Sequence, residues 1–214
     1  MLELGLRILL AYLLGTLLGS LVLGKLRGVD IRNSGSGNAG ATNALRTQGK
    51  AFAAAVLILD IAKGVLAVTW VPVLSLPHIA PDPEVSREWL VLACGLAVIV
   101  GHVYPVWFGF RGGKGVATVV GVIGAIQPWL LLPLLGCWLV VVLLTGYVGL
   151  ASMLAGVGLA IAVRVATPGD LPLLAFCLTV TVFVIFTHRA NIARMLAGTE
   201  SRARKLWLFR PRAA

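Results

Sequence analysis

The sequence predicts an all-α integral membrane protein, because its composition is apolar and its apolar runs are long and unbroken. Of the 214 residues, 59% are hydrophobic and only 12% are charged. The mean hydropathy of +0.97 lies far above that of a water-soluble domain. The runs lack the period-two alternation of membrane barrel strands, so helices must satisfy the backbone groups inside lipid. We expect a single membrane domain over residues 1–214, with a basic tail from about residue 188.

Seven apolar runs predict seven transmembrane helices, since one crossing of a bilayer takes about 20 residues. They cover approximately residues 4–23, 51–74, 89–107, 115–127, 129–148, 153–166 and 171–187. The first run follows Met1 almost directly and no small-residue cleavage site comes after it, so we expect a retained helix and no signal peptide. The fourth run is the shortest, and Pro128 imposes a break after it. A bent or re-entrant arrangement is therefore the alternative for this run.

The distribution of basic residues predicts which side of the membrane is cytoplasmic. An odd number of spans puts the termini on opposite sides, and most Lys and Arg then fall on one side: Lys25, Arg27, Arg32, Arg46, Lys50, Arg111, Lys114, Arg189, Arg194, Arg202, Arg204, Lys205, Arg210 and Arg212. The opposite connections carry mainly acidic residues: Asp82, Glu84, Glu88 and Asp170. We predict an outside amino terminus and a cytoplasmic carboxyl terminus. The net charge of +10 follows from the same asymmetry and suits anionic leaflet lipids better than nucleic acid.

Four short polar stretches interrupt the apolar chain, and the predicted topology puts all four on the cytoplasmic face. They are residues 35–43 with Arg46, residues 112–115, Ser152, and residues 188–191. Together they hold glycines, hydroxyls, amides and cations, which are the groups that bind phosphate. We therefore predict one composite site for an anionic ligand, at a level that a lipid tail also reaches.

The first stretch reads G-S-G-N-A-G from Gly35 to Gly40 and formally fits a dinucleotide-binding fingerprint, with Asp60 at the spacing of the ribose ligand. That fingerprint requires a preceding strand in a βαβ unit, whereas a predicted membrane helix precedes it here. Closely spaced glycines still let backbone N–H groups converge on an anion, and Arg46 offers a planar fork for phosphate oxygens. The predicted ligands are Ser36, Gly37, Asn38, Thr42, Asn43 and Arg46. The alternative is a loop that binds nothing.

The second stretch, Gly112-Gly113-Lys114-Gly115, resembles a nucleotide-binding P-loop only superficially. Phe108 stands where the first glycine of that motif belongs, and Gly115 stands where Ser or Thr would hold magnesium. A glycine-flanked lysine at the start of a helix nevertheless suits phosphate, because free N–H groups and the positive end of the helix dipole point the same way. We predict that all four residues bind phosphate. The alternative is a lysine that only anchors the helix at the membrane surface.

His188 and Asn191 are three residues apart, on one face of a helix and at one level of the membrane. An imidazole that titrates near neutrality suits proton transfer or phosphate binding, so we predict that both are site residues. His102 lies at the cytoplasmic end of the third predicted helix, where a structural role and a substrate contact are both open. Asp60 and Lys63 lie inside the second predicted helix. Charges within a membrane suggest function, but a neutralising ion pair is the simpler reading.

Metal and cofactor chemistry are not expected. Near the predicted cytoplasmic face only Asp30 and Glu200 supply carboxylates, which is too few for a magnesium or two-metal site. The three cysteines stand alone within apolar runs, as packing residues do. Arginine, lysine, histidine and backbone amides must therefore manage the charge of a phosphate ligand.

Three stretches resemble the membrane-integral bacterial acyl-phosphate:glycerol-3-phosphate acyltransferases. They are residues 36–43 with Arg46, residues 101–118, and residues 188–200, and they span nearly the whole chain. The resemblance implies seven helices in the bacterial inner membrane, an outside amino terminus and an active site on the cytoplasmic face. It also implies which residues hold the phosphate-bearing substrates: Ser36, Arg46, Lys114, Ser152, His188 and Asn191. Ala39 departs from the family, because many members carry proline there.

The resemblance further implies that the 1-hydroxyl of glycerol 3-phosphate attacks the carbonyl carbon of a fatty acyl phosphate. The products are inorganic phosphate and lysophosphatidic acid, a precursor in phospholipid synthesis. The expected catalytic residues are His188, Asn191 and Ser152, and the partners are the two substrates and membrane lipid. The hydroxyl proton goes either to His188 or to a substrate phosphate oxygen, and the second is favoured because surrounding anions favour a charged histidine.

Two other functions compete with this reading. A membrane transporter of a phosphate ester is the main alternative, and Asp60 and Lys63 are the residues that favour it, because transporters place ionisable groups within the membrane. A metal-dependent lipid phosphotransferase is the other, and the scarcity of carboxylates on the predicted cytoplasmic face argues against it.

Overall fold

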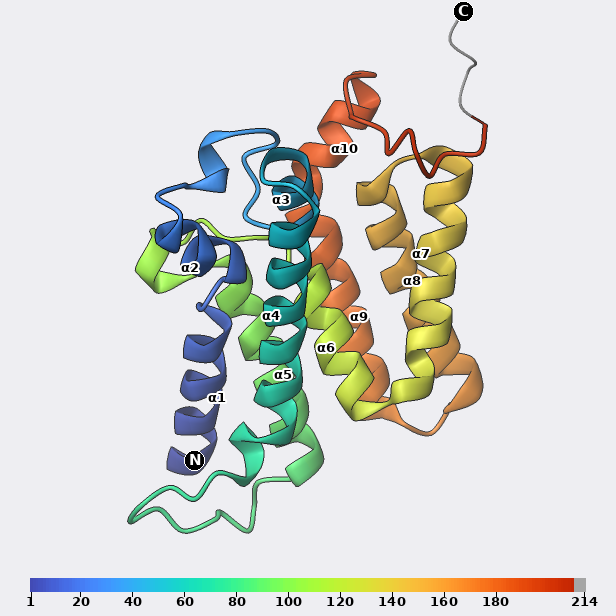
Figure 1. The fold of residues 1–214 in the computed structure, drawn as a ribbon. Coiled ribbons are helices and arrows are strands. Elements are labelled where there is room, and N and C mark those ends of the chain that lie inside the picture. Colours follow the sequence, from blue (N-terminus) through green and yellow to red (C-terminus); the bar gives the residue numbers. More distant parts are fainter. Residues whose placement is uncertain (210–214) are drawn as a thin grey trace, which may run out of the picture. The chain divides into compact units, whose positions relative to one another are not determined.

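Every regular element in the described part of the chain, residues 1–209, is helical in the computed structural model (Figure 1). This confirms the predicted all-α class over that range. The chain forms two compact units, Met1–Ile126 and Gln127–Ala214, which we call unit 1 and unit 2. The single domain over the whole chain stays a prediction. Arg210 and Arg212 of the predicted basic tail lie outside the described residues.

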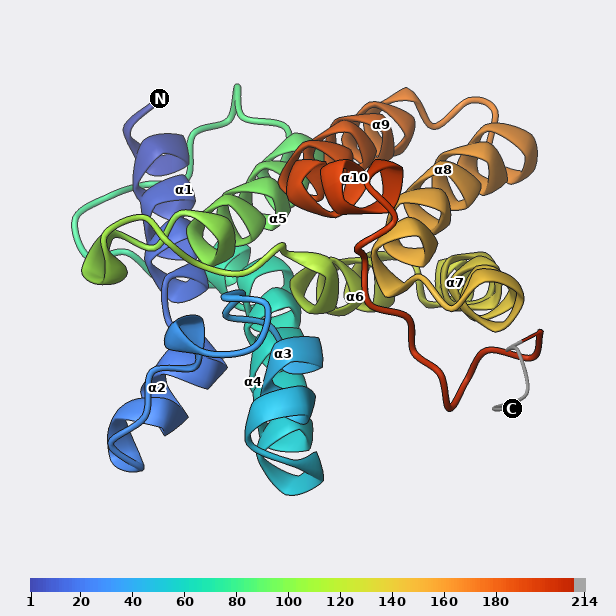
Figure 2. The same cartoon turned by 90° about the horizontal axis from the view of Figure 1, so that it is seen from above.

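Unit 1 is built on four packed helices, with two shorter ones at one end. Its α-helices are α1 Leu2–Gly15, α2 Gly19–Leu26, α3 Ala41–Thr47, α4 Lys50–Thr69, α5 Arg87–Val103 and α6 Val116–Ile126. Helix α4 packs against α5 and α6, and α1 packs along α5. The amino terminus and the connection before α5 lie at one end of the unit, whereas α2, α3 and the connection before α6 lie at the other (Figure 1). Seen from above, α3 lies over α4 (Figure 2).

The first predicted helix is broken, so the prediction of one continuous span over residues 4–23 was wrong. Helices α1 and α2 meet at an angle of 47°. Side chains of α4 replace the backbone hydrogen bonds lost there, because Lys63 donates to the carbonyl oxygens of Gly15 and Leu17, at 2.8 and 3.2 Å. Asp60 accepts a hydrogen bond of 3.3 Å from the N–H of Gly19, at the start of α2. Polar groups inserted into a helix ladder are a known cause of kinks.

Glycines let the helices of unit 1 approach one another closely. A Cβ atom on Gly64 of α4 would lie 2.4 Å from the carbonyl oxygen of Thr118, and one on Gly121 of α6 would lie 2.1 Å from that of Ile61. Small residues at such crossings are typical of helix packing in membranes. Helix α6 keeps its predicted place but has only 11 residues. At about 1.5 Å per residue it is too short to cross a bilayer alone.

Unit 2 contains α7 Leu131–Thr145, α8 Val148–Ala166, α9 Leu171–Thr187 and α10 Arg189–Leu196. Helix α8 packs against both α7 and α9. The turn between α8 and α9 lies at one end of the unit, and the start of α8 lies at the other end with α10 (Figure 1). Helices α9 and α10 meet at 53°. Helix α8 begins five residues before its predicted start at Met153, so Ser152 lies inside the helix and not in the connection before it.

The basic segment after α10 folds back over the end of α7. The N–H of Ala203 donates to the carbonyl oxygen of Gly146 at 2.8 Å, and the indole of Trp207 donates to that of Leu144 at 3.1 Å. The guanidinium of Arg202 stacks over the rings of Tyr147 and Trp207, at 4.5 and 4.2 Å from their centroids. These contacts satisfy carbonyl groups that a helix leaves unpaired at its end.

The helices of the described chain are those of a membrane protein. Four of them are long and apolar enough to cross a bilayer, or up to six if each bent pair counts as one span. Large apolar side chains point outward from them, for example Leu132 and Val182, which are 81% and 68% exposed. Such faces are stable in contact with lipid. The count of seven spans and the sides of the two termini stay predictions.

Candidate active site

Two glycine-rich loops lie together at one end of unit 1. We call residues 34–40 the first glycine loop and residues 109–115 the second glycine loop. Arg32 connects them, because its guanidinium donates to the carbonyl oxygens of Phe108 and Arg111 at 3.0 and 3.1 Å. The same guanidinium forms an ion pair of 2.7 Å with Asp30, which lowers the pKa of the Asp30 carboxyl below its ordinary value. The sequence pattern did not indicate this role, because Phe108 and Arg111 accept these bonds with their backbone and not with a side chain.

Asn43 shapes the first glycine loop from inside. It is only 1% exposed, and its side-chain oxygen accepts a hydrogen bond of 2.8 Å from the N–H of Ser36. Its side-chain nitrogen donates to the carbonyl oxygens of Ile31 and Ser34, at 2.9 and 3.1 Å. Gly35 has a φ of +62°, and a Cβ atom there would lie 2.3 Å from the Asn43 oxygen. The amide of Asn43 is thus used to hold the loop, and the predicted contact with a ligand stays a prediction.

The other predicted ligands of the first stretch lie nearer the surface. Ser36, Gly37, Thr42 and Arg46 are exposed, and Asn38 is half-buried. Thr42 and Arg46 stand four residues apart on α3, so their side chains share a face of that helix. This face combines a hydroxyl with a guanidinium, which together suit a phosphate group.

Ala39, the residue that departs from the family, is fully buried at the base of the first loop. It belongs to a small apolar cluster with Leu18 and Leu21, against which Phe108 packs. The hydroxyl of Ser20 donates to the carbonyl oxygen of Ala39 at 2.5 Å. The loop is therefore anchored by α2 without the rigid ring of a proline.

The second glycine loop is folded directly onto the end of α5. The N–H groups of Gly112 and Gly113 donate to the carbonyl oxygens of Val103 and His102, at 3.0 and 3.1 Å. A Cβ atom on Gly112 would lie 2.1 Å from the His102 carbonyl oxygen. Only glycine allows this approach. These two N–H groups thus pair with the last carbonyls of α5, and a contact of Gly112 or Gly113 with phosphate stays a prediction.

Lys114 and Gly115 stand immediately before α6, as predicted. Helix α6 begins at Val116, and Gly115 adopts a φ of +85° that favours glycine. Lys114 is half-buried. Lys114 thus lies two residues before the first residue of α6. A cation beside the amino end of a helix is an arrangement that suits an anion.

His102 lies inside unit 1, beneath the second glycine loop. It is 2% exposed, and its Nδ1 lies 3.5 Å from a carboxylate oxygen of Asp60. The other edge of the ring meets Gly113, where a Cβ atom would lie 2.1 Å from Nε2. Of the two roles that the sequence left open, this placement favours the structural one, and a direct contact of His102 with substrate stays a prediction.

Unit 2 brings the other three predicted residues to one end. His188 stands between α9 and α10, is 3% exposed, and holds its Nδ1 at 2.8 Å from the carbonyl oxygen of Val184. A carbonyl oxygen only accepts, so Nδ1 carries a proton. Asn191 packs against α8, since a Cβ atom on Gly149 would lie 3.0 Å from its side chain. Ser152 is three residues beyond Gly149 on the same face of α8.

Two further contacts fix the side chains of this end. The hydroxyl of Ser152 donates to the carbonyl oxygen of Val148 at 3.0 Å and accepts from the indole of Trp138 at 3.3 Å. The amide of Asn191 donates to Glu200 at 2.7 Å, and Arg194 pairs with the other oxygen of Glu200 at 2.6 Å. The sequence suggested Glu200 only as a carboxylate near the membrane surface, because its pairing depends on the turn after α10.

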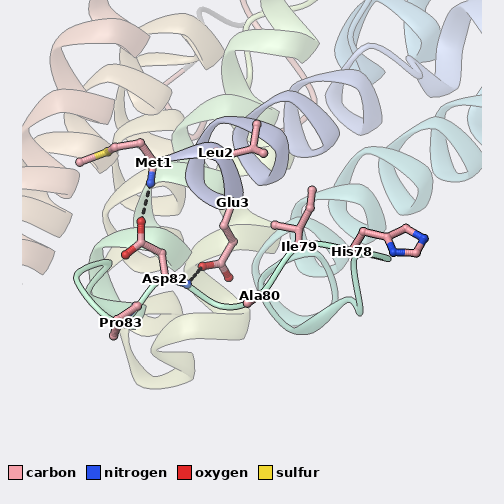
Figure 3. A pocket seen from close by; sticks show the side chains of 8 residues that line it. All are labelled: Met1, Leu2, Glu3, His78, Ile79, Ala80, Asp82 and Pro83. Atoms are coloured by element: carbon pink, nitrogen blue, oxygen red, sulfur yellow. Dashed lines mark hydrogen bonds and ion pairs between the residues drawn. The ribbon is translucent and has the colours of Figure 1, made fainter.

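The opposite end of unit 1 holds a hollow of different character (Figure 3). Met1, Glu3, His78 and Asp82 are among its lining residues, and none of the predicted site residues is. The terminal amine pairs with the Asp82 carboxylate, and Glu3 accepts a hydrogen bond of 2.7 Å from the N–H of Asp82. Arg87 also pairs with Glu3, at 2.7 Å. These groups fasten the connection before α5 to α1.

Comparisons with known proteins agree with the resemblance seen in the sequence. The model of a family described as glycerol-3-phosphate acyltransferase matches residues 5–198. A glycerol-3-phosphate acyltransferase of Aquifex aeolicus is 40% identical over 195 residues, covering 91% of this chain and 96% of the relative. One of a Synechococcus strain is 44% identical over 208 residues, covering 95% and 98%. One of Chlorobium phaeobacteroides is 40% identical over 220 residues, covering 91% and 94%.

Two crystal structures of PlsY (YgiH), an integral membrane glycerol 3-phosphate acyltransferase, are also similar to this chain. The glycerol 3-phosphate form has a TM-score of 0.79 and 38% identity, and covers 93% of this chain and 94% of its own. The lysophosphatidic acid form has a TM-score of 0.77 and 37% identity, with the same coverage. With a family match from residue 5 to residue 198 and relatives at this identity, the chain belongs to the glycerol-3-phosphate acyltransferase family and is a membrane-integral acyltransferase.

Proposed function

We propose that this enzyme transfers a fatty acyl group from acyl phosphate to the 1-hydroxyl of glycerol 3-phosphate. The hydroxyl oxygen forms a bond to the carbonyl carbon, the bond from that carbon to the phosphate oxygen breaks, and inorganic phosphate leaves. The remaining product is lysophosphatidic acid. The observation that carries the proposal is that Thr42, Arg46 and Lys114 lie at the end of unit 1 where two glycine loops are tied together.

Both units serve this reaction in the proposal. Arg46 and Lys114 of unit 1 bind phosphate oxygens, with Ser36, Asn38 and Thr42 as neutral donors. In unit 2, His188, Asn191 and Ser152 form the catalytic group. Acyl phosphate is already an activated mixed anhydride, so the enzyme mainly neutralises phosphate charge and holds the hydroxyl near the carbonyl. Such positioning contributes on the order of 7 to 11 kcal/mol in well-oriented systems.

The hydroxyl proton passes to a phosphate oxygen of the substrate. The Nδ1 of His188 donates to the Val184 carbonyl, and we assign Nε2 as the atom that acts on substrate. Beside two phosphates the imidazole is favoured in its charged form, in which Nε2 donates a hydrogen bond and cannot accept a proton. His188 is therefore a phosphate donor in this mechanism.

The two carboxylates that the sequence places near the predicted cytoplasmic face are already paired with arginines. Asp30 pairs with Arg32 at 2.7 Å, and Glu200 pairs with Arg194 at 2.6 Å. Each pair uses the oxygens that a magnesium ion would need as ligands. We therefore assign the phosphate charge to cationic side chains, and no residue of the site to a metal.

The transporter reading loses the observation that favoured it. Asp60 and Lys63 form the predicted ion pair, at 3.1 Å, and both also hold the break between α1 and α2. Their burial is thus explained by the fold. Purified enzyme in detergent separates the two functions, because only an acyltransferase forms product where no compartment exists.

The deciding experiment measures formation of lysophosphatidic acid by the purified enzyme with glycerol 3-phosphate and three acyl donors in parallel, because this product is the same for every donor. Acyl phosphate should support turnover, whereas acyl-CoA and acyl-carrier protein should not. Arg46→Ala and Lys114→Ala should each lose most of the activity with acyl phosphate. Turnover with acyl-CoA, or variants as active as the wild type, would overturn the proposal.

We also propose that the enzyme lies in the bacterial inner membrane with the amino terminus outside and the glycine loops in the cytoplasm. The excess of basic residues in the connections beside those loops supports this orientation. Single cysteines at Glu84 and Ser201, in a protein whose three native cysteines are replaced, test it. A membrane-impermeant maleimide added to spheroplasts should label position 84 and not position 201. The reverse pattern would contradict the orientation.

A further inference from the structure

Three ionisable side chains form one cluster in the interior of unit 1, where α4 and α5 pack together. Asp60 and Lys63 of α4 and His102 of α5 are 1%, 4% and 2% exposed. Ionisable groups buried in a membrane protein are costly unless they are paired or functional. The proposed reaction uses none of the three directly, so their presence needs an explanation of its own.

Part of the explanation is structural. One oxygen of Asp60 lies 3.1 Å from the ammonium group of Lys63 and accepts the N–H of Gly19. Lys63 in turn donates to the carbonyl oxygens of Gly15 and Leu17. These contacts hold the break between α1 and α2, from which the chain continues to the first glycine loop. They require Asp60 and Lys63, but they do not require a histidine.

The rest of the cluster is not satisfied by the fold. Among the described residues, three buried polar atoms have no hydrogen-bond partner, namely Oδ2 of Asp60, Nδ1 of His102 and Oγ1 of Thr118. Buried polar atoms are nearly always paired in proteins, so exceptions call for a functional reason. Nδ1 of His102 lies 3.5 Å from Oδ1 of Asp60, which is an electrostatic contact slightly longer than a hydrogen bond. The ring therefore faces a carboxylate that orients it.

The opposite edge of the same ring supports the second glycine loop. A Cβ atom on Gly113 would lie only 2.1 Å from Nε2 of His102, and 3.0 Å from the two ring carbons beside it. The Gly113 N–H is bonded to the His102 backbone at 3.1 Å. A rotation of the imidazole would therefore displace Gly113, and Lys114 is the next residue. Asp60 thus acts on the His102 ring, and the ring acts on Lys114 through Gly113.

From these contacts we infer that Asp60 and His102 are positioning residues that set the place of Lys114, with Asp60 acting through the His102 ring. In metal sites and in catalytic triads, a carboxylate beside a histidine sets the orientation of the imidazole ring. Asp60 has the same role toward His102 in this scheme. Neither residue touches substrate in this scheme. The inference rests on the proposed function only in that Lys114 binds a phosphate of one of the two substrates.

A kinetic comparison of three variants tests the inference. Asp60→Asn keeps the size of the side chain and an oxygen for the Gly19 N–H, but removes the charge. His102→Asn removes the ring. Lys114→Ala identifies the substrate whose apparent KM depends on the lysine. We expect Asp60→Asn and His102→Asn to raise the KM of that same substrate by about tenfold, which is typical for removal of an orienting partner.

A double-variant cycle tests whether Asp60 acts through the ring. In Asp60→Asn/His102→Asn the rise in KM should equal that of His102→Asn alone, since the carboxylate has nothing left to orient. Multiplied effects would show that the two residues act separately and would overturn the inference. A KM unchanged in both single variants would also overturn it.

A stability control separates positioning from general damage. Val56 is a fully buried residue of α4, one turn before Asp60, in a cluster that does not include His102. Val56→Ala should lower the melting temperature without a change in KM. If Asp60→Asn alone does not yield folded protein, Asp60→Asn/Lys63→Gln removes both charges of the pair and is measured in its place. The same KM criterion then decides.

These experiments distinguish a failure of the positioning role from a failure of the proposed reaction. If the wild type releases no phosphate from acyl phosphate, the proposed reaction is wrong. If the wild type is active and the His102 and Asp60 variants behave as Val56→Ala does, with lowered stability and an unchanged KM, the positioning role is wrong and the reaction stands.

Discussion

The guanidinium of Arg32 donates a hydrogen bond of 3.0 Å to the carbonyl oxygen of Phe108, a residue 76 positions further along the chain. A second bond reaches the carbonyl oxygen of Arg111, at 3.1 Å. One side chain thereby sets the distance between the two glycine loops of unit 1. Bonds from a charged donor are among the stronger ones in proteins, so this connection restrains both loops.

Arg32→Gln should therefore loosen the loops and weaken substrate binding. The glutamine is shorter and neutral, so it loses the bonds to the second loop and leaves Asp30 without its partner. We expect kcat/KM to fall by about tenfold, as for other residues that orient a site. Arg27→Gln is the matched control, because Arg27 lies in the same connection but stacks over Phe52. Equal losses in the two variants would show that the connection to the second loop is not the cause.

The ion pair between Asp30 and Arg32 should make the thermal stability of the enzyme depend on pH in the acidic range. Arg32 lowers the pKa of the Asp30 carboxyl in the folded protein below its ordinary value of 3.8. A lowered folded pKa means that the stabilisation is present above pH 3.8 and is lost as the pH falls below it. The melting temperature of the wild type should thus exceed that of Asp30→Asn near neutrality, and the difference should shrink below the ordinary pKa. A difference that stays constant as acid is added would contradict this assignment.

The buried pair of Asp60 and Lys63 should be costly to break from one side. Lys63→Met leaves a buried carboxylate unpaired and removes the donors for two carbonyl oxygens at the break between α1 and α2. The loss of one partner of a buried pair typically costs about 3 to 5 kcal/mol. Asp60→Asn/Lys63→Met should be more stable than Lys63→Met alone, because no unpaired charge remains. Thermal unfolding in detergent measures both, and a double variant less stable than the single one would refute the explanation.

Apolar runs predict most of this fold, because a helix in lipid needs only length and composition. Helix α9 has the bounds expected from its run, Leu171–Thr187, and α6 differs by one residue at each end. The break between α1 and α2 escaped prediction because Leu17 and Leu18 continue the apolar run across it. The groups that stabilise it come from α4, more than 40 positions away. The hydroxyl of Ser152 interrupts the apolar run and so predicts a helix start at Met153, whereas α8 begins at Val148 and contains Ser152.

The sequence predicted the residue types of the candidate site, but not which hydrogen-bond partner each residue has. Arg46 is exposed and Lys114 is half-buried, and their role as phosphate ligands stays a prediction. Asn43 and Gly113 belong to the same motifs. The side-chain amide of Asn43, however, binds the first glycine loop, and the N–H of Gly113 binds the end of α5. The sequence predicted the side of the membrane for Arg32 but not its bonds to Phe108 and Arg111. A motif reports which groups lie near one another, whereas hydrogen-bond partners depend on tertiary contacts.

Gly149 should be sensitive to small substitutions because Asn191 packs on it. A Cβ atom at this position would lie 3.0 Å from Cγ and Nδ2 of Asn191. Gly149→Val should push the amide away from its place, and we expect kcat to fall by about tenfold or more. Gly136→Ala is the control, since a Cβ atom there meets nothing within 4 Å. A Gly149→Val enzyme with normal turnover would show that the position of Asn191 is not critical.

The replacement of His188 by glutamine separates phosphate binding from general-base catalysis. Nδ1 of His188 lies 2.8 Å from the Val184 carbonyl oxygen, and the proposed mechanism assigns the contact with substrate to Nε2. A glutamine amide can donate a hydrogen bond from a similar place, but it cannot accept the hydroxyl proton at neutral pH. If His188 is a phosphate donor, His188→Gln should raise the KM of a phosphate substrate and keep kcat within about tenfold.

General-base catalysis contributes roughly 100- to 10,000-fold to a rate, so its loss has a different signature. A collapse of kcat in that range, with an unchanged KM, would show that His188 takes the proton and would end the preference for a substrate phosphate oxygen. His188→Ala is the reference for both cases, because it can neither donate nor accept. The binding role predicts that glutamine restores most of the turnover that alanine loses, whereas the base role predicts that the two variants are equally inactive.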